Sequence, residues 1–471
     1  MNQPAGIRLI HRLKAWRNLW SSWDHDSDVR PMAPDLSEAD GERVRRQMRA
    51  CLETRGGEVT ARKRAARLGR VYLDLNPEGR RRFLALIAHE FGTNPAEVDR
   101  AITGVQAAAT PAERQAAEQA LHQALEAPRL KLLTQFNALP EGVKFLVDLR
   151  AEMMTMMRTD PMLAPLETDL RTLLVAWFDV GFLELMRITW HSPAALLEKI
   201  IAYEAVHAIK SWDDLKNRLD SDRRLYAFLH PRMPDEPLIF VQVALVKGMA
   251  DNVHTVLDEE APVLDPGEAD TAIFYSISNA QRGLDGISFG NFLIKRVVDS
   301  LSHEFPNLKA FATLSPVPGF RPWLEKKLKD GEPGFLTVSE HKTLKAVTGV
   351  GAKGSLKALL AREDWCVDEA RAATLKAPLT RLCARYLAVE KRPGGAAPRA
   401  LDPVAHFHLS NGARMERLNW LADCSPKGMR QSAGLMINYL YKLSEIDRNH
   451  ESYSAQGKVA LSSQIRTWVK V

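Results

Sequence analysis

The sequence predicts an α+β protein of more than one domain, with a helical bundle followed by an α/β region. Its 471 residues exceed one typical domain, and helix-capping signals recur through the first third. From about residue 237, runs rich in β-branched and aromatic residues alternate with helical ones. With 45% hydrophobic residues, the chain is able to bury a substantial core.

Composition narrows the classes of function. Lys and Arg total 64 against 58 Asp and Glu, a formal charge of +6, which suits an anionic ligand but not a nucleic-acid partner. The four cysteines form neither a CxxC pair nor a zinc-spaced cluster, which fits a reduced chain. No run of about 18 apolar residues occurs, so no transmembrane segment is expected.

The N-terminal 23 residues form a distinct arm. Apolar and tryptophan side chains recur at helical spacing between basic residues, and no acidic residue precedes Asp24. The pattern is typical of a transit peptide or a membrane-surface helix, and equally of an arm that packs on the body or on a partner subunit.

Helix starts mark the first third of the chain. In each, a capping residue precedes a proline, as in Asn76-Pro77, Asn94-Pro95 and Thr110-Pro111, the last with Glu113 in capping-box position. After the first start, one helical face carries Phe83, Leu84, Ile87 and Phe91, and Gly92 is expected to end the helix in a left-handed conformation. We expect the methionines at 153, 154, 156 and 157 to pack in the core.

The α/β region contains a βαβ unit. Strands are predicted over 237–245, 272–278 and 308–314. Between the last two, residues 287–301 place Phe289, Phe292, Leu293, Val297 and Leu301 on one helical face, so a right-handed crossover is expected. Residues 392–399, rich in proline and glycine, are predicted to form a surface loop.

A glycine-rich turn, residues 281–290, joins the second strand to the helix. Such a turn lets the backbone approach a ligand, and the helix start favours phosphate, so a pyrophosphate site is one interpretation. A plain connecting turn is the other, and the commoner one for an isolated case. A second segment, Gly349–Gly354, fits GxGxxG, but no convincing strand precedes it and Lys353 is misplaced for a P-loop, so a mobile loop is predicted.

Two further segments carry reactive side chains. Ser315 follows the third strand and begins Ser315–Phe320, whose prolines and glycine would fix the backbone; an ordinary Ser-Pro turn is the alternative. His406 and His408 would face the same side of a strand. No third ligand at a recognisable spacing supports a metal, which favours one functional and one structural histidine, and two structural ones remain the alternative.

Several of these segments together closely resemble one family, malonyl-CoA decarboxylase. The resemblance lies in six stretches: 274–278, 290–298, 313–320, 404–412, 189–193 and 230–238. It is strong over roughly residues 170–460 and weaker in the helical third. Several long motifs in the same order make it specific.

The resemblance implies a domain organisation. An N-terminal arm (1–38) would precede a helical oligomerisation domain (39–173) and a catalytic domain (174–471) similar to the GCN5-related N-acetyltransferase (GNAT) fold. A homo-oligomer, specifically a tetramer, is implied. In that fold the CoA pyrophosphate lies on a strand-to-helix loop, but Gly283–Ser288 meets the usual loop pattern only in part, which weakens assignment to a generic acetyltransferase.

The resemblance also implies the reaction and its residues. Malonyl-CoA would be converted to acetyl-CoA and carbon dioxide without a cofactor or metal, because the thioester itself accepts the electron pair. Ser315 and His408 are implied as the catalytic pair. Our hypothesis is that His408 protonates the α-carbon, a role that suits an imidazole titrating near neutrality, while Ser315 orients the malonyl group and accepts or relays a proton. Ser276 is implied as a supporting polar residue, and the implied substrate contacts, besides Ser315 and His408, are Asp285, Gly286, Ile287, Ser288, Phe289, Gly290 and Asn291.

Two alternative functions and a cellular location are also considered from the sequence. An acyl-CoA acyltransferase of the same fold would need an acceptor, and a CoA-binding regulator would show no turnover. The chain ends Trp468-Val-Lys-Val471, whereas animal members of the family may carry a Ser-Lys-Leu peroxisomal signal. A bacterial cytoplasm is expected, with mitochondria second because of the basic arm.

Overall fold

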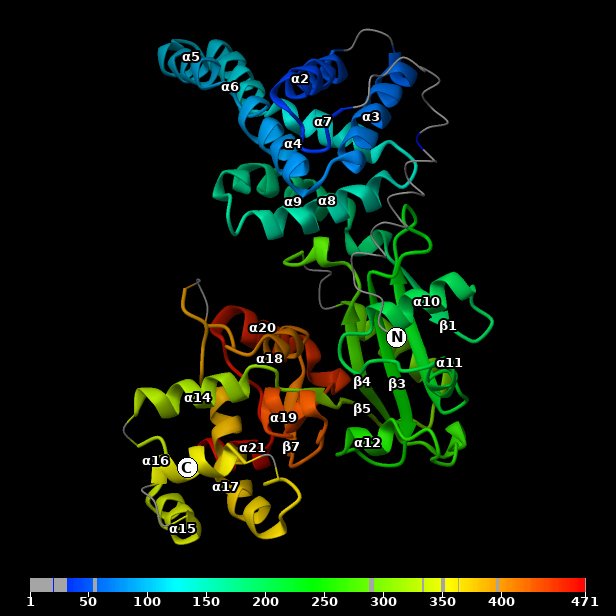
Figure 1. Ribbon diagram of the computed structural model, residues 1–471, viewed down its shortest axis with the longest axis vertical. Helices are drawn as coiled ribbons and strands as arrows, with labels where there is room; N and C mark the ends of the chain where they lie inside the picture. Colours follow the sequence, from blue (N-terminus) through cyan, green and yellow to red (C-terminus); the bar gives the residue numbers. More distant parts are fainter. Residues whose placement is uncertain are drawn as a thin grey trace. The chain divides into compact units, whose positions relative to one another are not determined.

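The protein is seen in a computed structural model, which describes residue 20 and residues 32–53, 57–287, 292–332, 334–348, 352–362, 364–394 and 398–470. The chain divides into two compact units (Figure 1). The first, here called the helical unit, takes in Met1–Leu183, His230–Pro234 and Gln281–Ser288. The second, the sheet unit, takes in Glu184–Leu229, Asp235–Ala280 and Phe289–Val471.

The helical unit consists of helices joined by short turns. They are α2 (Glu38–Leu52), α3 (Gly57–Asp74), α4 (Pro77–Glu90), α5 (Pro95–Ala107), α6 (Pro111–Leu125), α7 (Pro128–Asn137), α8 (Gly142–Met156), η1 (Pro161–Leu163), α9 (Ala164–Trp177), η2 (Val180–Phe182) and η4 (Arg282–Leu284). The three predicted starts are confirmed. Asn76 and Asn94 accept backbone N–H bonds at α4 and α5, and Thr110 and Glu113 form a reciprocal capping box at α6.

The end of α4 differs from the prediction. Phe83, Leu84, Ile87 and Phe91 are buried as expected, but Gly92 does not adopt a positive φ. Arg129 supplies the physical reason, because its Nη1 donates to Ala88 O (2.9 Å) and its backbone N–H donates to Phe91 O (2.9 Å). These donors satisfy carbonyls that a left-handed glycine would otherwise serve.

Two other predictions for this unit have mixed outcomes. Of the four clustered methionines only Met153 is buried, and the others are partly exposed on or just after α8. Within the first 23 residues the structure describes Trp20 alone, which is fully buried. Its Nε1 donates to Pro140 O (2.9 Å) and its ring packs edge-on against Phe145, so this residue packs on the helical unit.

The sheet unit is built on one mixed sheet. Its strands are β1 (Glu184–Ile188), β2 (Arg223–Leu229), β3 (Ile239–Val246), β4 (Thr271–Asn279), β5 (Ala310–Thr313), β6 (Ser315–Pro316), β7 (Arg414–Asn419) and β8 (Met436–Leu440). The order is β1-β2-β3-β4-β5-β8-β6, with β7 paired to β8. β4 and β5 are parallel and joined by α13 (Phe292–Glu304), which confirms the βαβ unit. β1, β2, β6, β7 and β8 were not predicted.

Helices and short turns accompany the sheet. They are α10 (Ala194–Tyr203), α11 (Trp212–Asn217), α12 (Val253–Val256), η3 (Pro266–Glu268), α14 (Phe320–Asp330), α15 (Val338–Thr348), α16 (Ala352–Leu360), α17 (Glu369–Ala388), α18 (Pro403–Ser410), α19 (Pro426–Ser432), η5 (Leu443–Glu445), α20 (Ile446–Gln456) and α21 (Ser463–Lys470). One apolar cluster packs α10 and α11 on the first three strands.

Two of the loop predictions can be compared with these elements. The predicted mobile loop at 349–354 is wrong for Ala352–Gly354, which begins α16, while 349–351 lie outside the described residues. Residues 392–399 lie between the bridged pair Lys391 and Ala400, and their described part has neither helix nor strand. Across the described chain, no helix combines the length and apolar character needed to cross a membrane.

Candidate active site

Ser315 begins β6, the short strand that follows β5 and pairs with β8. β5 ends at Thr313, and Ser315 then pairs with Ile437 of β8. The side chain is buried, with 5% of its surface exposed. The pairing of β6 with β8 therefore holds the backbone of Ser315 in place.

His408 lies on a helix, which corrects the predicted strand. Asp402 caps α18 by accepting from the backbone N–H groups of Val404 (2.9 Å) and Ala405 (3.0 Å). Two residues correspond to about 200° of helical rotation, so His406 and His408 point in different directions. His406 is partly exposed, and its Nδ1 lies 2.9 Å from the Tyr453 hydroxyl.

Ser315 and His408 form a buried dyad. Their Oγ and Nε2 atoms lie 3.1 Å apart, although 93 residues separate them in the chain. The Ser315 hydroxyl donates to Thr313 Oγ1 (2.8 Å), so the hydrogen shared with His408 belongs to Nε2. Nδ1 then accepts from the Tyr441 hydroxyl at 2.8 Å. The network thus defines a neutral ring protonated on Nε2.

The side chains that hydrogen-bond to His408 or stack on it are buried. The ring of His408 stacks on Tyr439, with centroids 4.5 Å apart. Burial lowers the pKa of His408 to about 3. The expectation that this imidazole titrates near neutrality is therefore wrong for the unliganded protein, because burial disfavours the charged form of the ring.

Ser276 lies on β4, at the edge of the sheet where the dyad lies. The parallel register pairs Phe274 with Thr313, and Ser276 and Ser315 each follow two residues later. The carboxyl ends of adjacent parallel strands share one edge, which is the usual place for a ligand in such sheets. Ser276 is buried, and its Oγ donates to both carboxylate oxygens of Glu204 (2.8 and 2.9 Å).

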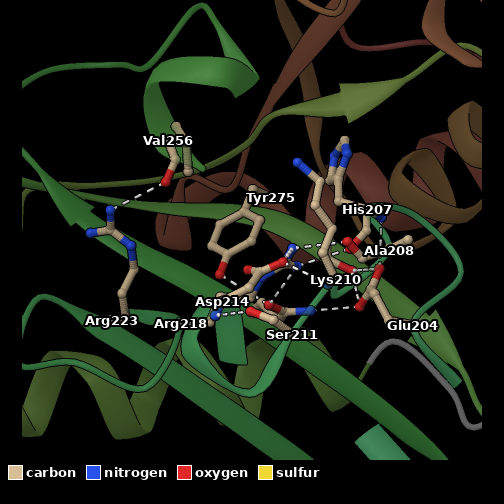
Figure 2. A network of polar contacts seen from close by, with 12 residues as sticks. Glu204, His207, Ala208, Lys210, Ser211, Asp214, Arg218, Arg223, Val256 and Tyr275 are labelled. Carbon is tan, nitrogen blue, oxygen red and sulfur yellow. Dashed lines mark hydrogen bonds and ion pairs between the residues drawn. The ribbon is translucent and has the colours of Figure 1, made fainter. Parts of the chain in front are cut away.

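Glu204, which follows α10, is a residue that the sequence analysis missed. Besides Ser276, it accepts from Gln242 Nε2 (2.5 Å) and from the backbone N–H groups of Val206 and His207 (2.8 Å each). Figure 2 shows Glu204 at one end of a polar network that continues to Arg218 and Asp214. No motif surrounds Glu204 in the sequence, so only the fold reveals it.

Thr313, Tyr439 and Tyr441 were also missed. Tyr439 and Tyr441 are two residues apart at the end of β8, and both contact the His408 ring, one by stacking and one by a hydrogen bond. Their alternation in an apolar run was an available signal. Where residues are described, no group of three metal-ligating side chains is arranged to hold a metal.

The glycine-rich turn belongs to the helical unit. Asp285, Gly286 and Ile287 are described, whereas the other predicted contacts, Ser288, Phe289, Gly290 and Asn291, lie outside the described residues. Gly286 is exposed and has φ +75°, a conformation that favours glycine. Burial raises the pKa of the Asp285 carboxyl.

Comparison with known proteins gives a consistent result. The family models of the malonyl-CoA decarboxylase N-terminal and C-terminal domains match residues 91–178 and 181–471. Mitochondrial malonyl-CoA decarboxylase of Rattus norvegicus is 41% identical over 83% of this chain and 82% of its own, and that of Anser anser anser is 37% identical over 87% and 84%.

Solved structures agree. Malonyl-CoA decarboxylase from Rhodopseudomonas palustris matches with a TM-score of 0.83 and 42% identity, over 91% of this chain and 99% of its own. The enzyme from Agrobacterium vitis matches with a TM-score of 0.81 and 42% identity, over 90% and 99%. The chain therefore belongs to the malonyl-CoA decarboxylase family, whose members are carboxy-lyases.

Proposed function

We propose that this chain converts malonyl-CoA to acetyl-CoA and carbon dioxide, with Ser315 and His408 as the catalytic pair. The observation that carries the proposal is the buried 3.1 Å contact between Ser315 Oγ and His408 Nε2. Membership of the family supports the choice of substrate, since the relatives are named for it.

The reaction needs two bond changes. The bond between the α-carbon and the carboxylate breaks, and its electron pair moves onto the thioester oxygen to give an enolate. A new C–H bond then forms at the α-carbon, so each turnover takes up one proton from solvent. The protein must stabilise the developing oxyanion, where one hydrogen bond contributes roughly 3 kcal/mol, and deliver the proton. We propose that no cofactor takes part.

Because the pKa of His408 is low without a ligand, we propose that the bound substrate raises it, so that the ring can take up the proton that it later donates. An anionic malonyl group beside an uncharged, desolvated ring raises the pKa of that ring by direct attraction. The proton taken up on Nδ1 can be held by Tyr441, whose hydroxyl can change from donor to acceptor. Nε2 then donates to the α-carbon, either directly or through Ser315, and the proton is retained until carbon dioxide has left.

The finer assignments form part of the same proposal. The turn at 281–287 would bind the phosphates of CoA, and the sheet unit would belong to the GNAT-like folds, which the parallel β4–α13–β5 unit supports. We also propose a homotetramer assembled through the helical domain. A bacterial cytoplasm is proposed because the matched solved structures come from bacteria, with mitochondria second because of the mitochondrial relatives.

Incubation with malonyl-CoA alone tests the proposal. The purified chain should release carbon dioxide and acetyl-CoA in equal amounts without an acceptor. The Ser315→Ala variant, assayed in parallel, controls for spontaneous decarboxylation and contaminating enzymes. Turnover that appears only when an acceptor amine is added would instead establish the acyltransferase, and tight binding without turnover would establish a regulator.

A further inference from the structure

A buried arginine of the helical unit holds the glycine-rich turn. Arg150 on α8 has 2% of its surface exposed. Its Nη1 donates to the carbonyl oxygens of Gly283 (2.6 Å) and Asp285 (3.0 Å). Its Nε and Nη2 donate to Glu167 Oε1 on α9 (2.9 and 2.7 Å), which balances the charge. One guanidinium thus connects two helices and two carbonyls of the turn.

A second arginine and a close backbone approach reinforce this arrangement. Arg171 Nη2 on α9 donates to Gly286 O (2.9 Å). The backbone of Gly283 approaches α8 so closely that a Cβ there would lie 1.7 Å from Val147 O. The turn is therefore packed directly on α8, and three of its carbonyls point to guanidinium groups.

The direction of these carbonyls determines where the N–H groups point. In a trans peptide the carbonyl and the following N–H point to opposite sides, so the N–H groups of Leu284, Gly286 and Ile287 point away from the arginines. Leu284 and Ile287 donate to carbonyls within the turn. The N–H of the exposed Gly286 has no acceptor among the residues that the structure describes. It remains available to an outside anion.

Positively charged side chains outnumber negatively charged ones near the Gly286 N–H. The charge of Arg150 is balanced by Glu167, while Asp285, on which Arg282 acts, is the one carboxylate among the described residues 281–287. Arg171, bonded to Gly286 O, adds a further positive charge. Arg282 is exposed and held by Thr155, to whose Oγ1 its Nη2 donates (2.9 Å). A phosphate group fits such surroundings, since backbone N–H groups and guanidinium groups are its usual donors.

We propose that Arg150 is a positioning residue, which shapes the turn so that the Gly286 N–H is presented to the pyrophosphate of a CoA thioester. The inference rests on the proposed function, which supplies that ligand, and it assigns to α8 of the helical unit a part in substrate binding. Without the guanidinium, the buried carbonyl of Gly283, the partly buried carbonyl of Asp285 and the Glu167 carboxylate lose their partner, and the turn relaxes.

Two substrates separate this role from a general structural one. Malonyl-pantetheine lacks the nucleotide and the pyrophosphate but keeps the malonyl thioester. In the full-length Arg150→Met variant, KM for malonyl-CoA should rise about tenfold or more, equivalent to about 1.4 kcal/mol, with kcat within about twofold of wild type. KM for malonyl-pantetheine should stay unchanged.

The matched control is Arg80→Met. Arg80 is also a buried arginine of the helical unit, bonded to Glu152 and to the carbonyls of Leu73 and Leu75, but it has no hydrogen bond to the turn. This variant should leave both KM values unchanged. If Arg150→Met does not fold, Arg150→Lys replaces it and should give an intermediate rise for malonyl-CoA only.

The outcomes that overturn the inference are distinct. A folded Arg150 variant with wild-type KM for malonyl-CoA, or with an equal rise for both substrates, would remove Arg150 from pyrophosphate positioning. If the wild-type chain does not decarboxylate malonyl-CoA, the proposed function fails. The inference is then tested by calorimetric binding of CoA and pantetheine, where Arg150→Met must weaken CoA alone.

Discussion

The dyad and the glycine-rich turn use opposite physical means. The dyad joins side chains 93 residues apart in the interior, where burial lowers the pKa of His408 to about 3. The turn is one contiguous stretch, 281–287, that offers a backbone N–H and lies among guanidinium groups. The proposed binding of an anion thus relies on fixed positive charge, whereas the proposed chemistry begins only when the substrate brings its own charge.

The largest effects are expected at the dyad. Ser315→Ala and His408→Asn should each lower kcat by about 10²- to 10⁴-fold, because each removes a group that acts on the proton or the oxyanion. KM should change little, since the turn is intact. Steady-state kinetics on both variants measures the two parameters separately.

His406→Asn is the matched control for the dyad. It removes an imidazole from the same helix, but its Nδ1 contacts Tyr453 and not Ser315. Turnover should stay within about twofold of wild type. Near-native turnover of either dyad variant would exclude that residue from the mechanism. If His406→Asn lowered turnover as much as His408→Asn, the loss would come from damage to α18 and not from loss of the dyad.

Local sequence patterns predicted much of the fold, and the strands that were not predicted show which information such patterns lack. The helix starts and the apolar strands β3, β4 and β5 were predicted from adjacent residues. β2 begins with Arg223 and Arg224 before the apolar run 225–229, and β7 carries charges at three of its six positions, and neither strand was predicted. Arg224 is buried because Glu304 on α13 pairs with it at 2.7 Å. Such a partner comes from tertiary structure and cannot be inferred from neighbours in sequence.

The candidate site likewise has parts that local sequence patterns predict and parts that they do not. Ser315 and the turn could be located from strand and glycine patterns, but the pairing of Ser315 with His408 came from family resemblance and depends on a contact across 93 residues. The strand predicted at His408 was wrong although a signal existed, because Asp402-Pro403 is the same capping pattern as Asn76-Pro77. The pKa of His408 depends on burial, which no local pattern carries.

The two glycines of the turn give the next largest effect. Gly283→Ala forces a Cβ to within 1.7 Å of Val147 O, so α8 or the turn must move, at a cost of about 3 kcal/mol in unfolding free energy. Gly286 has open space around it but φ +75°, so Gly286→Ala should cost only about 1 kcal/mol. Denaturant unfolding measures both. Equal losses would mean that packing on α8 does not fix the turn.

The smallest expected effect is a pH-dependent change in stability, which tests whether His408 is neutral in the unliganded protein. The pKa of His408 is about 3 in the folded chain, against about 6.5 for an unperturbed imidazole. Between those values the unfolded chain binds more protons, so stability is lost as pH falls through this window. From pH 7.5 to 5.0 the loss from this one ring should be about 2 kcal/mol.

Comparison with His408→Asn isolates that ring. Burial also lowers the pKa of His207, to about 4, and the carboxylates titrate as well, but these groups are present in both proteins and cancel in the difference. Wild type should therefore lose about 2 kcal/mol more unfolding free energy than the variant between the two pH values. Parallel pH profiles would mean that the pKa of His408 is the same in the folded and the unfolded chain, so that burial does not hold the ring neutral.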